Sequence, residues 1–179
     1  MRLVGGDTKV VEHGKADGLG ISSAGIGGLS SRVSLDSAQV QAGDKVILSG
    51  PIGDHGITIL LARGELDLEA DLTSDTRSVW PFVEALIEAV PDGLRWMRDH
   101  TRGGVASALN ELARDTNLGI DLDETRIPLH PAVRGACEIL GLDPFHIANV
   151  GLFIAIVAAD VADQALATLH TISGGQDAQ

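Results

Sequence analysis

The Asp-His-Thr-Arg-Gly-Gly segment at residues 99–104 combines residue types that can bind an oxyanion. Apolar residues follow it with the i, i+4, i+7 spacing of an amphipathic helix, at Val105, Leu109 and Leu112. A helix is therefore predicted to begin where the two glycines end. The first turn of a helix carries unpaired N–H groups and the positive end of the helix dipole, which together favour a bound anion.

Four residues of this segment are candidate phosphate-binding groups: Thr101, Arg102, Gly103 and Gly104. Thr101 can cap the helix, and the two glycines let a ligand approach bare backbone. The guanidinium group of Arg102 presents a fork of donors that suits phosphate or carboxylate. The alternative is a glycine-rich turn in which Arg102 pairs with a nearby acidic side chain, and the local pattern leaves both open.

A second candidate cluster lies near the start of the chain, where Asp7, Thr8 and Lys9 follow two glycines. The Asp7 carboxylate can bind a magnesium ion, and the Thr8 hydroxyl can bind a phosphate. The Lys9 amine can act as a fixed charge or as a proton carrier. Turns collect the same residue types, so an ordinary turn before a strand, with Lys9 exposed, is the alternative.

The glycine-rich loop at residues 50–56 carries an acid and an imidazole, Asp54 and His55. Folds that alternate strands and helices bind ligands in loops at strand ends, so both side chains are candidate cofactor-binding groups. The alternative has Asp54 as a helix cap and His55 exposed to solvent.

The remaining reactive residue types form no pattern typical of a site. His130 and His146 are not spaced as metal ligands, so a zinc site is not expected. Cys137 lies on the apolar face of a predicted helix and is expected to belong to the core rather than to act as a nucleophile. The acidic cluster at residues 121–124 is expected to be a solvated turn.

The composition narrows the class of protein. The chain has 179 residues and a formal net charge of −12, which argues against a nucleic-acid or membrane-surface partner. The longest apolar run, at residues 152–159, is far shorter than the roughly 20 residues of a membrane helix. A single cysteine excludes an internal disulfide and, with no signal-peptide pattern, predicts a cytoplasmic location.

The elements that must position these residues alternate between strands and helices. Strands are predicted at residues 9–11, 20–24, 45–49, 94–98, 120–122 and 152–158. Helices are predicted at residues 57–64, 81–90, from 105 to between 117 and 119, 131–140, and 161–169, the last one capped by Asp160. The polar stretch 173–179 is expected to fray. The alternation predicts an α+β fold, in which helices are layered on a mixed sheet.

Several segments, in order along the chain, resemble the hydrogenase expression/formation family HypE, within the AIR synthase-related superfamily. The resemblance is carried by residues 6–11, 43–50 with 52–56, 98–105, 109–113 and 137–144. It implies the fold of the AIR synthase (PurM) C-terminal domain, a layered α/β structure with a mixed sheet that is partly ferredoxin-like. In this scheme residues 39–172 form that domain, residues 1–38 are a remnant of the N-terminal domain, and residues 173–179 are a polar tail.

The resemblance also implies a function in the maturation of NiFe hydrogenase. Members of the family use ATP to dehydrate a thiocarboxamide on their own C-terminal cysteine to a thiocyanate, the source of the cyanide ligands. The implied cofactors are ATP and Mg²⁺, and the implied partners are a second copy, HypF and HypC–HypD. Lys9 is the implied catalytic residue and Asp7 the implied metal ligand. The implied cofactor-binding residues are Asp7, Thr8, Asp54, His55, Thr101, Arg102, Gly103 and Gly104.

The chain departs from the family pattern at a few points. The N-terminal domain and the terminal Pro-Arg-Ile-Cys are not present, the usual Asn-Glu-Gly reads Asn149-Val150-Gly151, and His100 replaces a common proline. We therefore expect that this chain by itself is not a competent carbamoyl dehydratase. Two alternatives stay open: a non-catalytic assembly or binding module, and another ATP-dependent enzyme of the AIR synthase superfamily.

Overall fold

The computed structural model describes residues 4–15, 18–28, 30–64 and 70–179. Its strands form one sheet in the order β1-β3-β2, with β1 at Lys45–Leu48, β2 at Leu94–Asp99 and β3 at Phe153–Val157. The α-helices of this part of the chain are α1 (Asp54–Ala62), α2 (Trp80–Ala89), α3 (Gly104–Thr116), α4 (Pro131–Leu140) and α5 (Ala162–His170). Short 3₁₀ turns lie at Ser37–Gln39, Glu124–Arg126, Pro144–His146 and Ala159–Val161.

Strand β3 is the centre of the molecule, and all of its residues are buried. It pairs with β1 on one edge and with β2 on the other. Because helices cover both faces of this strand, its sequence is a continuous apolar run rather than an alternation. This explains why the run was recognisable as a strand.

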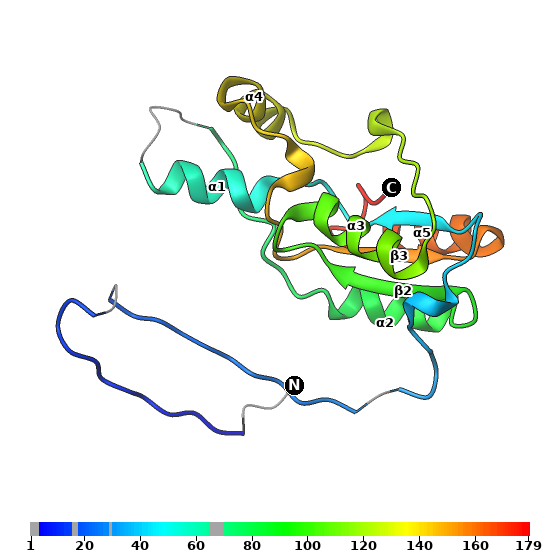
Figure 1. Cartoon of the computed structure of the whole chain (residues 1–179), viewed down its shortest axis with the longest axis horizontal. Coiled ribbons are helices and arrows are strands. Elements are labelled where there is room, and N and C mark those ends of the chain that lie inside the picture. The colour runs from blue at the N-terminus through cyan, green and yellow to red at the C-terminus, as the bar shows by residue number, and fades with distance from the viewer. Residues whose placement is uncertain (1–3, 16–17, 29, 65–69) are drawn as a thin grey trace.

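Two apolar cores lie on opposite faces of the sheet (Figure 1). On one face, α2 and α5 pack against β3 through residues that include Phe82, Leu86 and Leu169. On the other face, α3 packs through Val105, Leu109 and Leu112, the residues whose spacing predicted the helix.

Helices α1 and α4 pack against each other beside the sheet. Their shared core contains Ile57, Val133 and Cys137. The prediction that Cys137 is a core residue is confirmed.

The predicted α+β fold of the AIR synthase C-terminal domain is confirmed, but the prediction of a mixed sheet is wrong. Both strand pairs in the described residues are antiparallel. Strands β1 and β2 do run in the same direction, yet β3 lies between them and runs the opposite way. Order along the chain did not show which strands are neighbours.

Three predicted strands, at residues 9–11, 20–24 and 120–122, do not form. Residues 4–15 and 18–28 lie apart from the sheet (Figure 1), with Val10 89% and Ile21 86% exposed. A strand needs a hydrogen-bonded neighbour, and none of the described residues supplies one to these segments. Ile120 and Leu122 instead pack their side chains against the core next to α3, without ladder hydrogen bonds.

Two predictions about element ends are also wrong. Asp160 does not cap α5, because it lies within the 3₁₀ turn Ala159–Val161 that leads into the helix. The last residues do not fray: Ala178 is fully buried, and Gln179 exchanges two backbone hydrogen bonds with Leu48. The polar composition of residues 173–179 gave no indication of this pairing, because the hydrogen bonds are made by backbone groups.

The helices of the described residues are too short or too polar to cross a lipid bilayer.

Candidate functional site

Three loops that are far apart in the sequence meet at one end of the sheet, where β1 and β2 end and β3 begins. Leu48 at the end of β1 lies opposite Ile154, and Asp99 at the end of β2 lies opposite Phe153. The loop after β1, the segment after β2 and the turn before β3 therefore lie at the same end of the sheet. We call residues 49–54, 99–104 and 149–151 the loop edge.

The first turn of α3 lies at the loop edge and begins at two glycines in the left-handed region. Gly103 has φ +70° and Gly104 has φ +63°. A Cβ atom on Gly104 would overlap the carbonyl oxygen of Phe145 and lie 2.8 Å from that of Ile147. The chain therefore needs glycine here, both for the backbone angle and because α3 begins directly against residues 145–147.

The amino end of α3 has no side-chain cap. The backbone N–H groups of Gly104 and Val105 donate to no acceptor in the described residues, whereas the Ser107 N–H donates to the Gly103 carbonyl. Arg102 is exposed beside them. Free N–H groups, the helix dipole and a guanidinium group make this end of α3 able to hold a phosphate or carboxylate.

Thr101 does not cap α3, which corrects the prediction. Its hydroxyl donates to the Asp99 carboxylate at 2.8 Å, and its backbone N–H lies 3.4 Å from the same oxygen. The Thr101 hydroxyl bond is the main cause that lowers the pKa of Asp99. An ionised carboxylate therefore lies two residues before the candidate phosphate-binding turn, where it can share a divalent cation with a bound phosphate.

His100, between these residues, is buried at 1% exposure, and neither ring nitrogen has a hydrogen-bond partner in the described part of the chain. Burial lowers the pKa of His100, so the neutral imidazole is favoured.

Asp54 and His55 lie in the first turn of α1, not in an open loop. Asp54 is buried, and both of its oxygens lie 2.9 Å from the Nδ1 of His130. Burial raises the pKa of Asp54, and the hydrogen bond to His130 opposes this effect. His55 Nδ1 lies 2.9 Å from the Ser74 hydroxyl. Both candidate side chains thus contact other side chains, and the hydrogen bonds to His130 fix the position of the Asp54 carboxyl group.

The turn at residues 149–151 is held by buried and half-buried groups. The Asn149 side chain accepts the Gly53 N–H at 2.7 Å and donates to the Ile147 carbonyl at 2.9 Å. The Asp75 carboxylate accepts the N–H groups of Val150 and Gly151 at 3.0 and 3.2 Å. The turn has a defined shape, and it presents Val150 at the surface with 39% exposure.

The cluster Asp7, Thr8 and Lys9 is exposed and lies apart from the loop edge (Figure 1). Its one side-chain hydrogen bond in the described residues is local, from the Thr8 N–H to Asp7 at 2.8 Å. The structure therefore brings Thr101, Arg102, Gly103, Gly104 and Asp54 to one edge, but does not bring the N-terminal cluster to them.

Four contributors to the loop edge escaped prediction from the sequence: Asp75, Arg77, His130 and Asn149. Arg77 donates to the carbonyls of Ser49, Gly151 and Gly174. These partners lie 28 to 97 positions away, so no local pattern could reveal them. For Asn149 alone there was a signal, its place in an Asn-x-Gly turn before the apolar strand.

No group of three or more His, Cys, Asp or Glu side chains positioned to hold a metal ion occurs among the residues that the structure describes.

Comparison with known proteins identifies a family and several relatives. Residues 41–173 match the family described as AIR synthase related protein, C-terminal domain. The chain is 46% identical over 178 residues to a carbamoyl dehydratase HypE of Bradyrhizobium diazoefficiens, covering 99% of the chain and 51% of that protein. It is 42% identical over 176 residues to carbamoyl dehydratase HypE of Escherichia coli, covering 98% of the chain and 52% of that protein.

Solved HypE structures have the same fold. The crystal structure of E. coli HypE aligns with a TM-score of 0.79 and 38% identity, over 85% of this chain and 46% of that one. A HypE–HypF complex aligns with a TM-score of 0.77 and 35% identity, over 80% and 47%. HypE in complex with ATP aligns with a TM-score of 0.75 and 40% identity, over 80% and 43%. The chain spans about half the length of the curated relatives that it matches.

Proposed function

Because the chain belongs to the AIR synthase related proteins through their C-terminal domain, we propose that it supplies the C-terminal domain function of a HypE-like carbamoyl dehydratase. In this function the loop edge holds the phosphate end of ATP during the dehydration of a cysteine-bound thiocarboxamide to a thiocyanate. The observation that carries the proposal is the uncapped amino end of α3, where N–H groups without an acceptor in the described part of the chain lie beside exposed Arg102.

The residues at the loop edge fit a phosphate group but do not by themselves form a nucleoside pocket. Among the described residues, no group accepts the N–H of Gly104 or of Val105, and Gly103 is exposed. The Ser107 side chain occupies the position that a Cβ atom of Gly103 would take. Arg102 adds positive charge that stabilises a phosphate as negative charge develops on it. When bound, ATP supplies the activation, because phosphorylation of the amide oxygen makes that oxygen a leaving group.

Asp99 is the residue that we assign to a divalent cation at this phosphate. Its pKa is lowered, chiefly by the Thr101 hydroxyl, so it carries charge at neutral pH. Without a cation, the Asp99 carboxylate would repel a phosphate. A bound Mg²⁺ would accept oxygen ligands from both groups and so remove this repulsion. We retain Asp7 as a second Mg²⁺ ligand and Thr8 as a phosphate ligand in the assembled protein.

Lys9 is the proposed catalytic residue, and it requires the assembled protein. Lys9 is exposed, and the segment at residues 4–15 that carries it lies apart from the sheet (Figure 1), so the chain alone is expected to lack dehydratase activity. We place residues 39–172 in the C-terminal domain and assign residues 1–38 to the domain that precedes it in the relatives. We also propose that the protein forms a homodimer in the cytoplasm. Its transfer partners are proteins of the HypF and HypC–HypD kind.

Calorimetric titration with ATP and Mg²⁺ tests the phosphate site directly. We expect this chain to bind ATP. The Arg102→Ala variant should bind ATP about tenfold more weakly, because it loses one charge-assisted hydrogen bond. Arg114→Ala is the matched control, because Arg114 is exposed at the opposite end of α3. Equal affinities for the Arg102 and Arg114 variants would exclude the amino end of α3 as the phosphate site.

A non-catalytic assembly module is the second candidate, and the exposed apolar Val150 favours it because valine cannot transfer a proton. Under that function the chain binds a HypF-like protein with equal affinity with and without ATP. Pull-down with purified HypF in both conditions separates the two candidates.

A further inference from the structure

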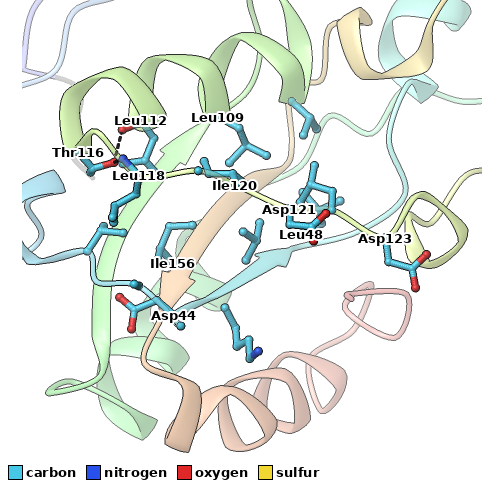
Figure 2. Close-up of a pocket in the computed structure, with 18 of the residues that line it drawn as sticks. Asp44, Leu48, Leu109, Leu112, Thr116, Leu118, Ile120, Asp121, Asp123 and Ile156 are labelled. Atoms are coloured by element: carbon cyan, nitrogen blue, oxygen red, sulfur yellow. Dashed lines mark hydrogen bonds between the residues drawn. The ribbon is translucent and has the colours of Figure 1, made fainter.

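The hydroxyl group of Ser74 has a basic side chain as its neighbour. In the groove between α3 and β1, by contrast, the Thr116 hydroxyl donates to the Leu112 carbonyl at 2.8 Å (Figure 2), and a carbonyl oxygen does not take up a proton at neutral pH. The Ser74 oxygen lies 2.9 Å from the Nδ1 of His55, the one hydroxyl–imidazole contact in the part of the chain that the structure describes. A neutral imidazole can accept a proton near pH 7, so this contact can serve chemistry.

Thr76 completes the surroundings of the Ser74 oxygen. Its backbone N–H donates to that oxygen at 3.2 Å, and its hydroxyl lies 2.7 Å away. A serine oxygen has two lone pairs and one proton. When both Thr76 groups donate, the Ser74 proton points to the Nδ1 of His55, as in sites where a histidine activates a serine nucleophile. The two Thr76 donors then stabilise the negative charge that Ser74 develops as the proton leaves.

Ser74 lies directly beside the loop edge. The next residue, Asp75, accepts the N–H groups of Val150 and Gly151 with its carboxylate. A Cβ atom on Gly151 would overlap the Asp75 carbonyl oxygen, so the two segments are in direct contact. His55 follows the last residue of the loop after β1. Ser74 and His55 are both partly exposed, so a ligand held at the loop edge can reach them.

We propose that Ser74 is a phosphoryl acceptor, with His55 as its general base, for the nucleoside triphosphate whose phosphate end lies at the loop edge. This inference rests on the proposed function. The Ser74 oxygen forms a bond to the γ-phosphorus, and the bond from that phosphorus to the β–γ bridging oxygen breaks. The nucleoside diphosphate leaves with the electron pair, and the Ser74 proton passes to the Nδ1 of His55. Ser74 and the amide oxygen of the thiocarboxamide are then alternative acceptors of the same phosphoryl group.

The charges around Ser74 can accommodate a phosphate. His55 becomes positive when it takes the proton, and α1 has no side-chain cap, so the positive end of its dipole is uncovered in the turn that carries His55. The neighbouring acids already have donors. The Asp75 carboxylate accepts two backbone N–H groups, and the Asp54 carboxyl group contacts the Nδ1 of His130. These hydrogen bonds reduce the repulsion that the acids exert on a phosphate.

Incubation of the 179-residue chain with ATP and Mg²⁺, followed by mass spectrometry of its peptides, tests the proposal. We expect a phosphate on Ser74 and none at this position in Ser74→Ala. His55→Asn keeps a hydrogen-bonding group near the position of Nδ1 but cannot take up the proton, so transfer should slow at least about 100-fold. Ser78→Ala and His146→Asn are the matched controls, because both side chains are exposed, and both variants should keep the original rate.

Equal rates in His55→Asn and the original chain, or a phosphate on Thr76 or Ser78 in place of Ser74, would overturn the proposal. ATP binding in the calorimeter without phosphate on Ser74 would overturn it too and leave the proposed function intact. Diisopropyl fluorophosphate is the second probe, because it reacts with activated serines, releases fluoride and needs no nucleotide site. Labelling of Ser74 that is lost in His55→Asn would support the activated serine even where ATP binding, and with it the proposed function, fails. Absence of labelling by both reagents would overturn the assignment of Ser74 as a nucleophile.

Discussion

At the scale of single residues, His100 makes stability depend on pH. Burial lowers its pKa in the folded chain, so between that value and the ordinary pKa near 6.5 the unfolded chain binds more protons. The contribution of His100 is fully present above pH of about 6.5 and is lost as the pH falls through this window. We call this fall in unfolding free energy at low pH the acid loss. We predict that the acid loss is smaller in His100→Leu, as measured by urea unfolding between pH 5 and 7.5.

The same substitution is expected to raise stability at pH 7 by about 1 kcal/mol, because it removes two buried ring nitrogens that lack partners. His146→Leu is the matched control, since His146 is largely exposed. If the two variants show the same pH profile, the acid loss does not come from His100.

The pair Asp54–His130 is a second prediction at this scale. His130→Ala leaves a buried carboxylate without its ring partner, and we expect a loss of about 1–2 kcal/mol in unfolding free energy. Asp54→Asn removes the charge, so the double variant should lose less than the sum of the single losses. A double-mutant cycle by thermal unfolding measures this coupling, and strict additivity would show that the pair is not coupled.

At the scale of elements, the start of α3 depends on Gly104. Gly104→Ala combines a left-handed backbone with overlap of the Phe145 carbonyl oxygen, and strain of this kind costs about 1–3 kcal/mol. Gly135→Ala is the matched control: Gly135 lies inside α4, and an added Cβ there meets no atom within 4 Å. It should instead stabilise the protein by up to about 1 kcal/mol, because alanine is the better helix former.

Circular dichroism melts of both glycine variants check this prediction. Equal stability of the two variants would mean that the contact between α3 and residues 145–147 is loose. The phosphate-binding site proposed at the loop edge would then lack the rigid backbone that it needs.

At the scale of the whole molecule, Arg77 joins three distant parts of the chain. Its guanidinium group donates to carbonyls of Ser49, Gly151 and Gly174 and lies 4.3 Å from the centre of the Phe82 ring. We predict that Arg77→Ala lowers the unfolding free energy by about 2 kcal/mol.

Hydrogen exchange distinguishes this role from a general loss of packing. In the Arg77 variant, exchange should rise first in the turn at residues 149–151 and near Gly174. The exposed Arg63→Ala variant should show neither change. A uniform rise across the sheet would contradict the assignment of Arg77 to these segments.

The sequence by itself was sufficient for the elements that a local pattern defines. The spacing of Val105, Leu109 and Leu112 predicted α3, and the apolar run predicted β3, because periodicity follows directly from which face is buried. The glycines before α3 also identified where that helix begins. The family resemblance extended this to the class of fold, and the comparisons confirm it.

Only the tertiary structure decided which of these elements meet. The antiparallel sheet brings the ends of β1 and β2 to one edge, and partners such as Asp54 and His130 lie 76 positions apart. The Leu48–Gln179 pair likewise depends on backbone groups, which every residue type carries alike. Hydrogen bonds between distant segments leave no periodic trace in the sequence, so residues 99–104 could be recognised as a binding turn, but their neighbours could not be named.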